Sequence, residues 1–329
     1  MNNPLKYDNC DVAIIGAGPA GLAAATALKK EGIGRVLVLE REAQAGGIPR
    51  HCGHPPFGVL EYARVMTGPS YAKKNVKTAR EAGVDIALKT SVTQLGPKGE
   101  LDIVSPMGRG KIKAKRVLLA TGVRETPRSA RLVSGNRMIG IHTTGSLQSM
   151  VYLKNLIPFR NPVVVGTEIV SFSALFTCKK AGIKPVAMVE EKIRPSVLWP
   201  LHKAARLFNV PLYLNSQLID IIGKDRVKAV LVCDGKGDIH KIVCDGVLFT
   251  GLFTPESALV RMSHLKLDYD TRSPVIDKFG HCSDMAYYAA GNLLQPLNNS
   301  ANCWRQGRRT ARFIAQDLIT CRSHIKGNI

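Results

Sequence analysis

Three glycines near the N-terminus have the spacing of a dinucleotide-binding loop. Gly16, Gly18 and Gly21 form the pattern G-x-G-x-x-G. The pattern follows the apolar run Asp11–Ile15 and opens the Ala-rich segment Pro19–Lys30, so it joins a predicted strand to a predicted helix. Such glycines permit a tight turn, close approach of the backbone to a pyrophosphate, and close packing of helix on strand. The helix N-terminus also offers unpaired N–H groups to phosphate oxygens.

An acidic residue completes this pattern. Glu40 ends the predicted strand Arg35–Leu39, about 20 residues after Gly21. At that place a carboxylate accepts hydrogen bonds from ribose hydroxyls. A glycine-rich turn without a ligand is the alternative, but the strand, the helix and the acid together favour a nucleotide site.

A second dinucleotide-binding loop is predicted later in the chain, but two of its three glycine positions hold other residues. Gly166 follows the strand Pro162–Val165 and precedes the helix Ile169–Lys180, but the other two glycine positions hold Glu168 and Ser171. A carboxylate facing a pyrophosphate at short range costs on the order of a few kcal/mol. We therefore expect the scaffold to persist and NAD(P) binding to be weak or absent. The alternative is that Glu168 turns away and NAD(P) binds.

The two loops predict an α/β fold with two Rossmann-like dinucleotide-binding domains, the second inserted in the first. Residues 1–127 and 253–329 are expected to form the first, discontinuous domain, and residues 128–252 the second. The other predicted elements are the strands Val84–Leu88, Leu101–Val104, Lys111–Leu119, Lys184–Val189, Pro274–Ile276 and Tyr287–Ala290 and the helices Ser70–Ala82, Thr143–Leu156 and Ser300–Ile319. The region from Pro211 to Phe249 also has mainly strand character.

Three further motifs extend the comparison to the whole chain. They are Gly46-Gly47 in REAQAGGIPRHCGH, the sequence ATG at the end of RVLLATG, and Gly291-Asn292 before the last predicted helix. With them the chain resembles two-domain flavoproteins of the pyridine nucleotide-disulfide oxidoreductase and thioredoxin-reductase-like superfamily. In that group Gly291-Asn292 would replace a Gly-Asp pair near the ribityl chain of FAD, where Asn can still donate and accept a hydrogen bond.

The resemblance implies an FAD site made from all of these motifs and from the start of the last helix. The implied contacts are Gly16, Gly18, Pro19, Ala20, Gly21, Glu40, Arg41, Gly46, Gly47, Ile48, Ala120, Thr121, Gly122, Gly291, Asn292, Ser300 and Ala301.

The spacing of the cysteines differs from that of disulfide reductases, which need two cysteines close together in the sequence. None of the eight cysteines lies in a C-x-x-C pair, and Cys52 stands alone after Gly46-Gly47. The segments GGIPRHCGHPPFG, GTEIVSFSAL and ANCWRQGR instead resemble the FAD subunits of opine oxidase, hydrogen cyanide synthase and dye-linked proline dehydrogenase. That resemblance implies oxidation of small amines or imino acids, and a partner subunit or an iron–sulfur protein.

Candidate catalytic residues follow the second glycine pair. His51, Cys52 and His54 would lie near the flavin, where a histidine could accept a proton from a substrate amine. Arg50 and Arg305 could bind a carboxylate of an anionic substrate. The alternative is that the histidines only form hydrogen bonds in a turn. A metal site is not expected, because no fourth ligand has suitable spacing.

The amino-acid composition restricts the class of protein and its expected partners. The chain has 329 residues, 45% of them hydrophobic, and a formal net charge of +21. This is a globular composition. The basic residues are dispersed and aromatics make up only 6%, so nucleic acid is not an expected partner. There is no signal-peptide pattern and no apolar run that predicts a transmembrane segment. We expect a cytoplasmic protein, with peripheral membrane contact left open.

The leading functional expectation is an FAD-dependent dehydrogenase or oxidase. It would pass a hydride from a small amine, imino acid or related acid to flavin N5, with an electron acceptor other than NAD. Two alternatives stay open: an NAD(P)H-dependent FAD reductase, and a non-catalytic subunit that holds FAD within a complex.

Overall fold

Two compact units make up the chain. The computed structural model describes residues 9–131, 133, 136–196 and 208–326, with side chains as far as residue 320. The first unit comprises Met1–Arg50, Pro55–Arg124 and Thr254–Ile329, and the second comprises His51–His54 and Glu125–Phe253. The chain passes from the first unit to the second after Arg124 and returns at Thr254. The segment His51–His54 also groups with the second unit.

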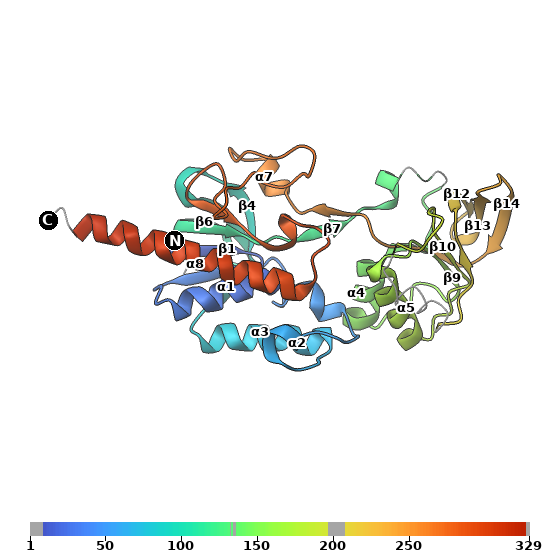
Figure 1. Ribbon diagram of the computed structural model, residues 1–329, viewed down its shortest axis with the longest axis horizontal. Coiled ribbons are helices and arrows are strands. Elements are labelled where there is room, and N and C mark those ends of the chain that lie inside the picture. The colour runs from blue at the N-terminus through green and yellow to red at the C-terminus, as the bar shows by residue number, and fades with distance from the viewer. Residues whose placement is uncertain (1–8, 132, 134–135, 197–207, 327–329) are drawn as a thin grey trace. The chain divides into compact units, whose positions relative to one another are not determined.

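A mostly parallel sheet forms the centre of the first unit (Figure 1). Its order is β3 (Asp85–Ala87), β2 (Val36–Leu39), β1 (Asn9–Ile15), β6 (Gly108–Leu119), β5 (Glu100–Ser105) and β4 (Ser91–Leu95), and β17 (Tyr287–Ala289) also pairs with β6. Strands β1, β2, β3, β6 and β17 pair in parallel, whereas β4, β5 and β6 pair antiparallel. Every residue of β2 is buried, as expected of a strand covered on both faces.

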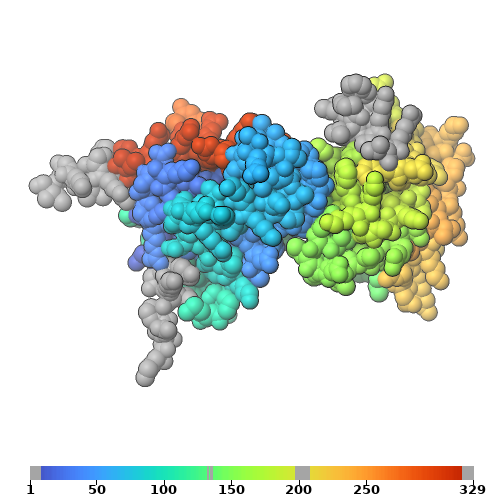
Figure 2. Space-filling view, turned by 90° about the horizontal axis from the view of Figure 1, so that it is seen from below, coloured from blue at the N-terminus to red at the C-terminus, as the bar shows by residue number. Residues whose placement is uncertain are grey.

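Helices α1 (Pro19–Lys30) and α8 (Ser300–Lys326) run side by side in the first unit (Figure 1). They approach closely at Gly307, where a Cβ atom would meet the Ala20 carbonyl oxygen at 2.1 Å. Helix α3 (Gly68–Glu81) follows the short α2 (Val59–Tyr62), and this stretch forms the light blue to cyan surface in Figure 2. A last short helix, α7, covers Ala258–Arg261.

The second unit has its own parallel sheet. Its order is β11 (Leu212–Tyr213), β10 (Ala187–Val189), β9 (Pro162–Val165), β15 (Gly246–Phe249) and β8 (Ile141–Thr143), with helices α4 (Thr144–Lys154) and α5 (Ile169–Ala181). A separate antiparallel sheet contains β12 (Ser216–Gly223), β13 (Val227–Asp234) and β14 (Ile239–Val243). Where the chain passes between the units, β7 (Val123–Glu125) pairs with β16 (Phe253–Pro255). The 3-10 turns are η1 (Ile48–His51), η2 (Pro97–Gly99), η3 (Arg128–Arg131) and η5 (Gly291–Leu293).

The two units repeat one local arrangement. The N–H of Gly16 donates to the carbonyl of Leu39 at 2.9 Å, and the N–H of Gly166 donates to the carbonyl of Val189 at 2.8 Å. In both units the first strand therefore enters its glycine turn beside the end of the second strand. The expected fold class, two Rossmann-like α/β units, is confirmed.

One predicted strand does not form. Pro274–Ile276 is not a strand, because only one isolated bridge, between Leu267 and Pro274, forms there. Strand β4 was not anticipated, because its SVTQL sequence is mostly polar and partly exposed. Among the described helices, none combines the length and the apolar character needed to cross a membrane.

Candidate functional site

In the first glycine loop two glycines lie against the backbone of neighbouring residues, and the third borders open space. Gly16 has φ +108°, and a Cβ there would meet the Ala120 carbonyl oxygen at 2.4 Å. A Cβ on Gly21 would meet the Gly16 carbonyl oxygen at 2.0 Å. At Gly18, by contrast, a Cβ would find no described atom within 4 Å. Gly16 and Gly21 are therefore required by the fold, and Gly18 leaves room in front of the N-terminus of α1.

Glu40 is held at the end of β2 by backbone donors. The Glu40 residue is only 9% exposed. Oε2 accepts the N–H of Ala17 at 3.0 Å, and Oε1 accepts the N–H of Glu42 at 2.9 Å. A carboxylate has about four lone-pair sites, so this orientation leaves capacity for ligand hydroxyl groups.

The second glycine pair lies against the first loop. The N–H of Gly46 donates to the Ala17 carbonyl at 2.8 Å, and a Cβ on Gly47 would meet the Gly18 Cα at 2.8 Å. Ile48, which follows, is 55% exposed. The predicted neighbours Gly46, Gly47 and Ile48 are therefore brought to the open space beside Gly18.

Arg50 is engaged within the first unit. Its guanidinium forms an ion pair with Glu42, and its Nε donates to the Gly47 carbonyl at 3.3 Å. The Arg50 side chain is only 12% exposed. To bind a substrate carboxylate, the Arg50 guanidinium would have to leave Glu42.

The ATG motif turns toward Glu256. The Thr121 hydroxyl donates to the Glu256 carbonyl at 2.8 Å, and the Glu256 N–H donates to the Gly122 carbonyl at 2.9 Å. The Glu256 carboxylate pairs with Arg124 and lies 3.6 Å from Arg41. These contacts anchor the motif where β6 ends.

The Gly291-Asn292 turn packs on the start of α1. The N–H of Gly291 donates to Gln306 Oε1 at 3.0 Å, and a Cβ on Gly291 would meet the Ala20 Cβ at 2.8 Å. Asn292 Oδ1 accepts the Cys303 thiol at 3.2 Å. Ser300 and Ala301 then begin α8. The structure thus gathers the predicted cofactor motifs of the first unit around the loop that contains Gly18.

The predicted catalytic residues His51, Cys52 and His54 group with the second unit, and Cys52 and His54 join a polar network with α4 and α5. The Cys52 thiol donates to Gln148 Oε1 at 3.6 Å, and Gln148 Nε2 donates to Ser173 Oγ at 2.7 Å. His54 Nε2 lies 2.6 Å from the same Ser173 oxygen. His51, like Cys52, is 8% exposed. Burial raises the pKa of the Cys52 thiol to about 12.

Cys52 is expected to resist alkylation in the native protein. With a thiol pKa of about 12, the reactive thiolate is on the order of one in ten thousand molecules at pH 8. Iodoacetamide labelling read by peptide mass spectrometry should be at least about 100-fold slower at Cys52 than in the urea-unfolded chain. The half-buried Cys233 is the internal control and should label first among the described cysteines. Rapid native labelling of Cys52 would contradict this expectation.

One titratable residue of the second unit was not found from the sequence. Glu125 accepts the N–H of Gly145 at 2.6 Å, at the start of α4. Burial raises the pKa of this carboxyl group, although the Thr143 hydroxyl and backbone N–H groups act in the opposite direction. No motif contains Glu125, so only the fold reveals its position.

The second glycine loop is closed by its own side chains. The hydroxyls of Ser171 and Thr250, both fully buried, donate to Glu168 Oε2 at 2.9 and 2.8 Å. A Cβ on Gly166 would meet both carboxylate oxygens of Glu168 at 2.8 Å, and one on Gly251 would meet Oε1 at 2.2 Å. The Glu168 carboxylate therefore lies against the turn at Gly166, whereas in the first unit Gly18, at the matching position of the motif, has no side chain.

Comparison with known families identifies the chain. The family model described as pyridine nucleotide-disulphide oxidoreductase matches residues 10–307. The chain belongs to this family. The expected resemblance is confirmed, and the protein is therefore placed among the FAD-dependent oxidoreductases of the pyridine nucleotide-disulphide oxidoreductase family.

Several curated relatives are components of larger systems. An opine oxidase subunit from Rhizobium meliloti (strain 1021) is 25% identical over 72% of this chain and 51% of its own length. The alpha subunit of sarcosine oxidase from Corynebacterium sp. (strain U-96) is 24% identical over 95% of this chain and 34% of its own length. The ferredoxin–NAD(+) reductase subunit of the Pseudomonas putida benzene 1,2-dioxygenase system is 24% identical over 94% of this chain and 74% of its own length. The chain thus spans about half or less of the first two relatives.

Solved structures share the fold. T. acidophilum thioredoxin reductase has a TM-score of 0.80 at 23% identity, over 95% of this chain and 100% of the other. L-proline dehydrogenase from P. horikoshii has a TM-score of 0.72 at 20% identity, over 95% of this chain and 57% of the other.

FAD, the cofactor of the family, fits the first unit on the unit's own geometry. The open space at Gly18 lies where backbone N–H groups of α1 are available to a pyrophosphate. Glu40 stands at the end of the neighbouring strand with capacity for ribose hydroxyls. The second loop does not have the same open space, because the Glu168 carboxylate lies against the turn at Gly166.

Proposed function

We propose that this chain is the FAD-holding part of a dehydrogenase or oxidase that acts on a small amine, an imino acid or a related acid. When bound, FAD supplies an acceptor for the hydride that leaves the substrate carbon. The electrons would then pass to an acceptor other than NAD(P). The names of the opine oxidase and sarcosine oxidase relatives support this substrate class.

The observation that carries the proposal is the contrast between the two glycine loops. Gly18 leaves open space in the first unit, whereas Glu168 places a carboxylate over the matching turn of the second. An anionic side chain there opposes the pyrophosphate of NAD(P)H by charge and by occupied volume. A chain that holds FAD but disfavours NAD(P)H needs its electrons from another substrate.

The proposed FAD contacts of this chain have separate tasks. The loop at Gly16, Gly18 and Gly21 would bind the pyrophosphate through backbone N–H groups, and Glu40 would orient the ribose. Gly46, Gly47, Thr121 and Asn292 would line the flavin half, with the first residues of α8 directing a positive helix end toward it. His51 stays a proposed proton acceptor for the substrate amine.

An anaerobic titration tests this function. Purified protein is expected to carry FAD, and its flavin absorbance should bleach when a small amino or imino acid is added. Two electrons and a proton leave the substrate as a hydride, and the amine loses a proton to give an imine. Bleaching by micromolar NADH or NADPH, with no response to any amine, would replace the proposal by an NAD(P)H-dependent FAD reductase.

One relative also supports a second candidate function. The benzene dioxygenase relative is named a ferredoxin–NAD(+) reductase subunit, which favours the reductase alternative. If neither nicotinamide nor amine bleaches the flavin, either alone or with a co-purifying subunit, the chain is a non-catalytic holder of FAD. An iron–sulfur protein or a second subunit is the proposed partner in the leading case.

A further inference from the structure

The segment His51–His54 contacts the helices of the second unit at regular intervals. His51 Cε1 lies 4.0 Å from the point that a Cβ on Gly145 would occupy. The Cys52 thiol donates to Gln148, one turn further along α4. Neighbouring residues of the segment therefore contact neighbouring turns of the same helix.

Gly53 continues this row of contacts along α4. A Cβ on Gly53 would meet the Tyr152 ring at 2.1 Å, so only glycine lets the backbone come this close. Gly145, Gln148 and Tyr152 are spaced i, i+3 and i+7, and such residues lie on one stripe of a helix. The segment thus follows one face of α4.

His54 ends the row of contacts on α5. Its Nε2 lies 2.6 Å from Ser173 Oγ, and its ring stacks on Phe176 with the ring centroids 5.8 Å apart. Gln148 Nε2 donates to the same Ser173 oxygen at 2.7 Å and to Thr177 Oγ1 at 3.4 Å. Gln148 is 3% exposed and Thr177 is fully buried. One buried amide therefore joins both helices to the segment.

The Ser173 hydroxyl is suited to hold His54 in either protonation state of the imidazole. A hydroxyl group has one hydrogen to donate and two lone pairs that accept. While one lone pair accepts from Gln148, the hydroxyl still donates to an unprotonated Nε2 or accepts from a protonated one. This contact therefore survives a change in the charge of His54.

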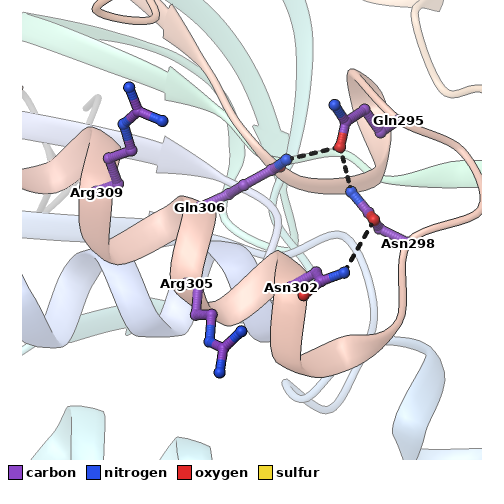
Figure 3. Close-up of a pocket in the computed structure, with 6 residues that line it drawn as sticks. All are labelled: Gln295, Asn298, Asn302, Arg305, Gln306 and Arg309. Atoms are coloured by element: carbon purple, nitrogen blue, oxygen red, sulfur yellow. Dashed lines mark hydrogen bonds between the residues drawn. The ribbon is translucent and has the colours of Figure 1, made fainter.

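A group of amides at the start of α8 shows the difference that burial makes (Figure 3). There Gln306 Nε2 and Asn298 Nδ2 both donate to Gln295 Oε1, but these hydrogen bonds are exposed to solvent. Water replaces a lost partner of an exposed amide at little cost, whereas a buried amide keeps an unsatisfied group. The hydrogen bonds of Gln148 therefore restrain their partners more strongly than those at the start of α8.

We propose that Gln148 and Ser173 are positioning residues for His51, the proton acceptor of the proposed function, on which this inference rests. They act through the neighbours of His51 in the chain, because Gln148 holds Cys52 and Ser173 holds His54. Cys52 and His54 are then anchors of the segment rather than reacting groups. This gives the second unit a role in substrate oxidation that needs no nicotinamide.

Hydrogen exchange of the FAD-loaded protein measures whether the segment is held. A peptide of residues 49–56 reports on the segment almost alone, because its other residues are one arginine and three prolines, and proline has no backbone N–H. Ser173→Ala and Gln148→Leu should each speed exchange in this peptide by about tenfold, the effect of losing one buried hydrogen bond.

Two further variants of α5 are the matched controls. Ser171→Ala also removes a buried hydroxyl from this helix, but that hydroxyl contacts Glu168 and Thr250. It should change exchange in the 49–56 peptide by less than about twofold. Ser173→Thr keeps the hydroxyl and should stay within about threefold of the wild type. Circular dichroism checks that each variant is folded.

Anaerobic stopped-flow reduction of the flavin measures the effect on the reaction. The probes are sarcosine and L-proline, two secondary amines without and with a ring. A misplaced proton acceptor slows the reaction step, so Ser173→Ala should lower the reduction rate at saturating substrate by about tenfold or more. The substrate concentration that gives half the maximal rate should change by less than about threefold, because the anchors do not touch the substrate. Ser173→Thr should restore the rate.

The two measurements separate this inference from the proposed function. Unchanged exchange in both Ser173→Ala and Gln148→Leu would overturn the inference. An equal gain in Ser171→Ala, or faster exchange with an unchanged reduction rate, would overturn it as well. If neither probe reduces the flavin of the wild type, the proposed function fails for these amines, and the exchange rates still decide whether Gln148 and Ser173 hold the segment.

Discussion

Gly18→Ala is expected to lower the affinity for FAD by roughly tenfold to a hundredfold while the first unit stays folded. The added methyl group meets no described protein atom within 4 Å, and Gly18 has an ordinary φ of −81°. The fold therefore tolerates the change. The methyl group enters the space that a pyrophosphate needs above the N-terminus of α1, so the cost falls on the ligand.

Gly21→Ala is the matched comparison, because the same methyl group has the opposite environment. There the Cβ would meet the Gly16 carbonyl oxygen at 2.0 Å, so the helix must move away from the strand. This variant should melt at lower temperature by circular dichroism and fail to retain FAD. Fluorescence titration of FAD into each apoprotein gives the affinities. Unchanged FAD affinity in Gly18→Ala would show that the cofactor does not approach this loop.

The first glycine loop could be predicted because its residue types follow from the local geometry of the backbone. Gly16 has a positive φ and Gly21 a close carbonyl contact, and both features leave a fixed spacing in the sequence. Glu40 is likewise specified by its place at the end of a buried strand. Strand–turn–helix order and the position of the acid follow from such short-range constraints, and the structure agrees with them.

The residues after the second glycine pair could not be placed in the same way. Their closeness to Gly47 in the sequence predicts a position beside the flavin, and that prediction stays open, while His51–His54 groups with the second unit. The partners that hold Cys52 and His54 there are Gln148 and Ser173, about 100 residues away in the chain, and no sequence spacing indicates such contacts. Glu125 was missed for the same reason, since its role depends on the backbone of Gly145.

The orientation of Glu168 was the question that the sequence left open. Its identity indicated a damaged nucleotide loop, but a glutamate can also point away from a ligand. Its carboxylate is held by Ser171 and Thr250 against the turn at Gly166, and Thr250 directly follows strand β15, far along the chain. Both hydroxyl groups are buried, and they also lie 2.7 Å from each other, so the carboxylate is part of a buried polar cluster.

Removing this carboxylate and its serine partner is expected to give the chain a working NAD(P)H site. In the variant Glu168→Gly, Ser171→Gly the second loop regains the glycines that Gly18 and Gly21 supply in the first. Removing a repulsion of a few kcal/mol between the Glu168 carboxylate and the pyrophosphate would raise the affinity for NAD(P)H by about 100-fold or more. The wild type should show slow flavin reduction by NADH that stays unsaturated at millimolar concentration, a range of about −4 kcal/mol.

Anaerobic stopped-flow reduction of the bound flavin by NADH and NADPH measures the effect, and Glu168→Gln separates charge from volume. The glutamine keeps the shape and the hydroxyl contacts of Glu168 but carries no charge. If repulsion dominates, Glu168→Gln should recover most of the gain; if occupied volume dominates, only the double glycine variant should. Rapid, saturable reduction of the wild type at micromolar NADH or NADPH would contradict both explanations, because it would require the Glu168 carboxylate to leave Ser171 and Thr250 at little cost.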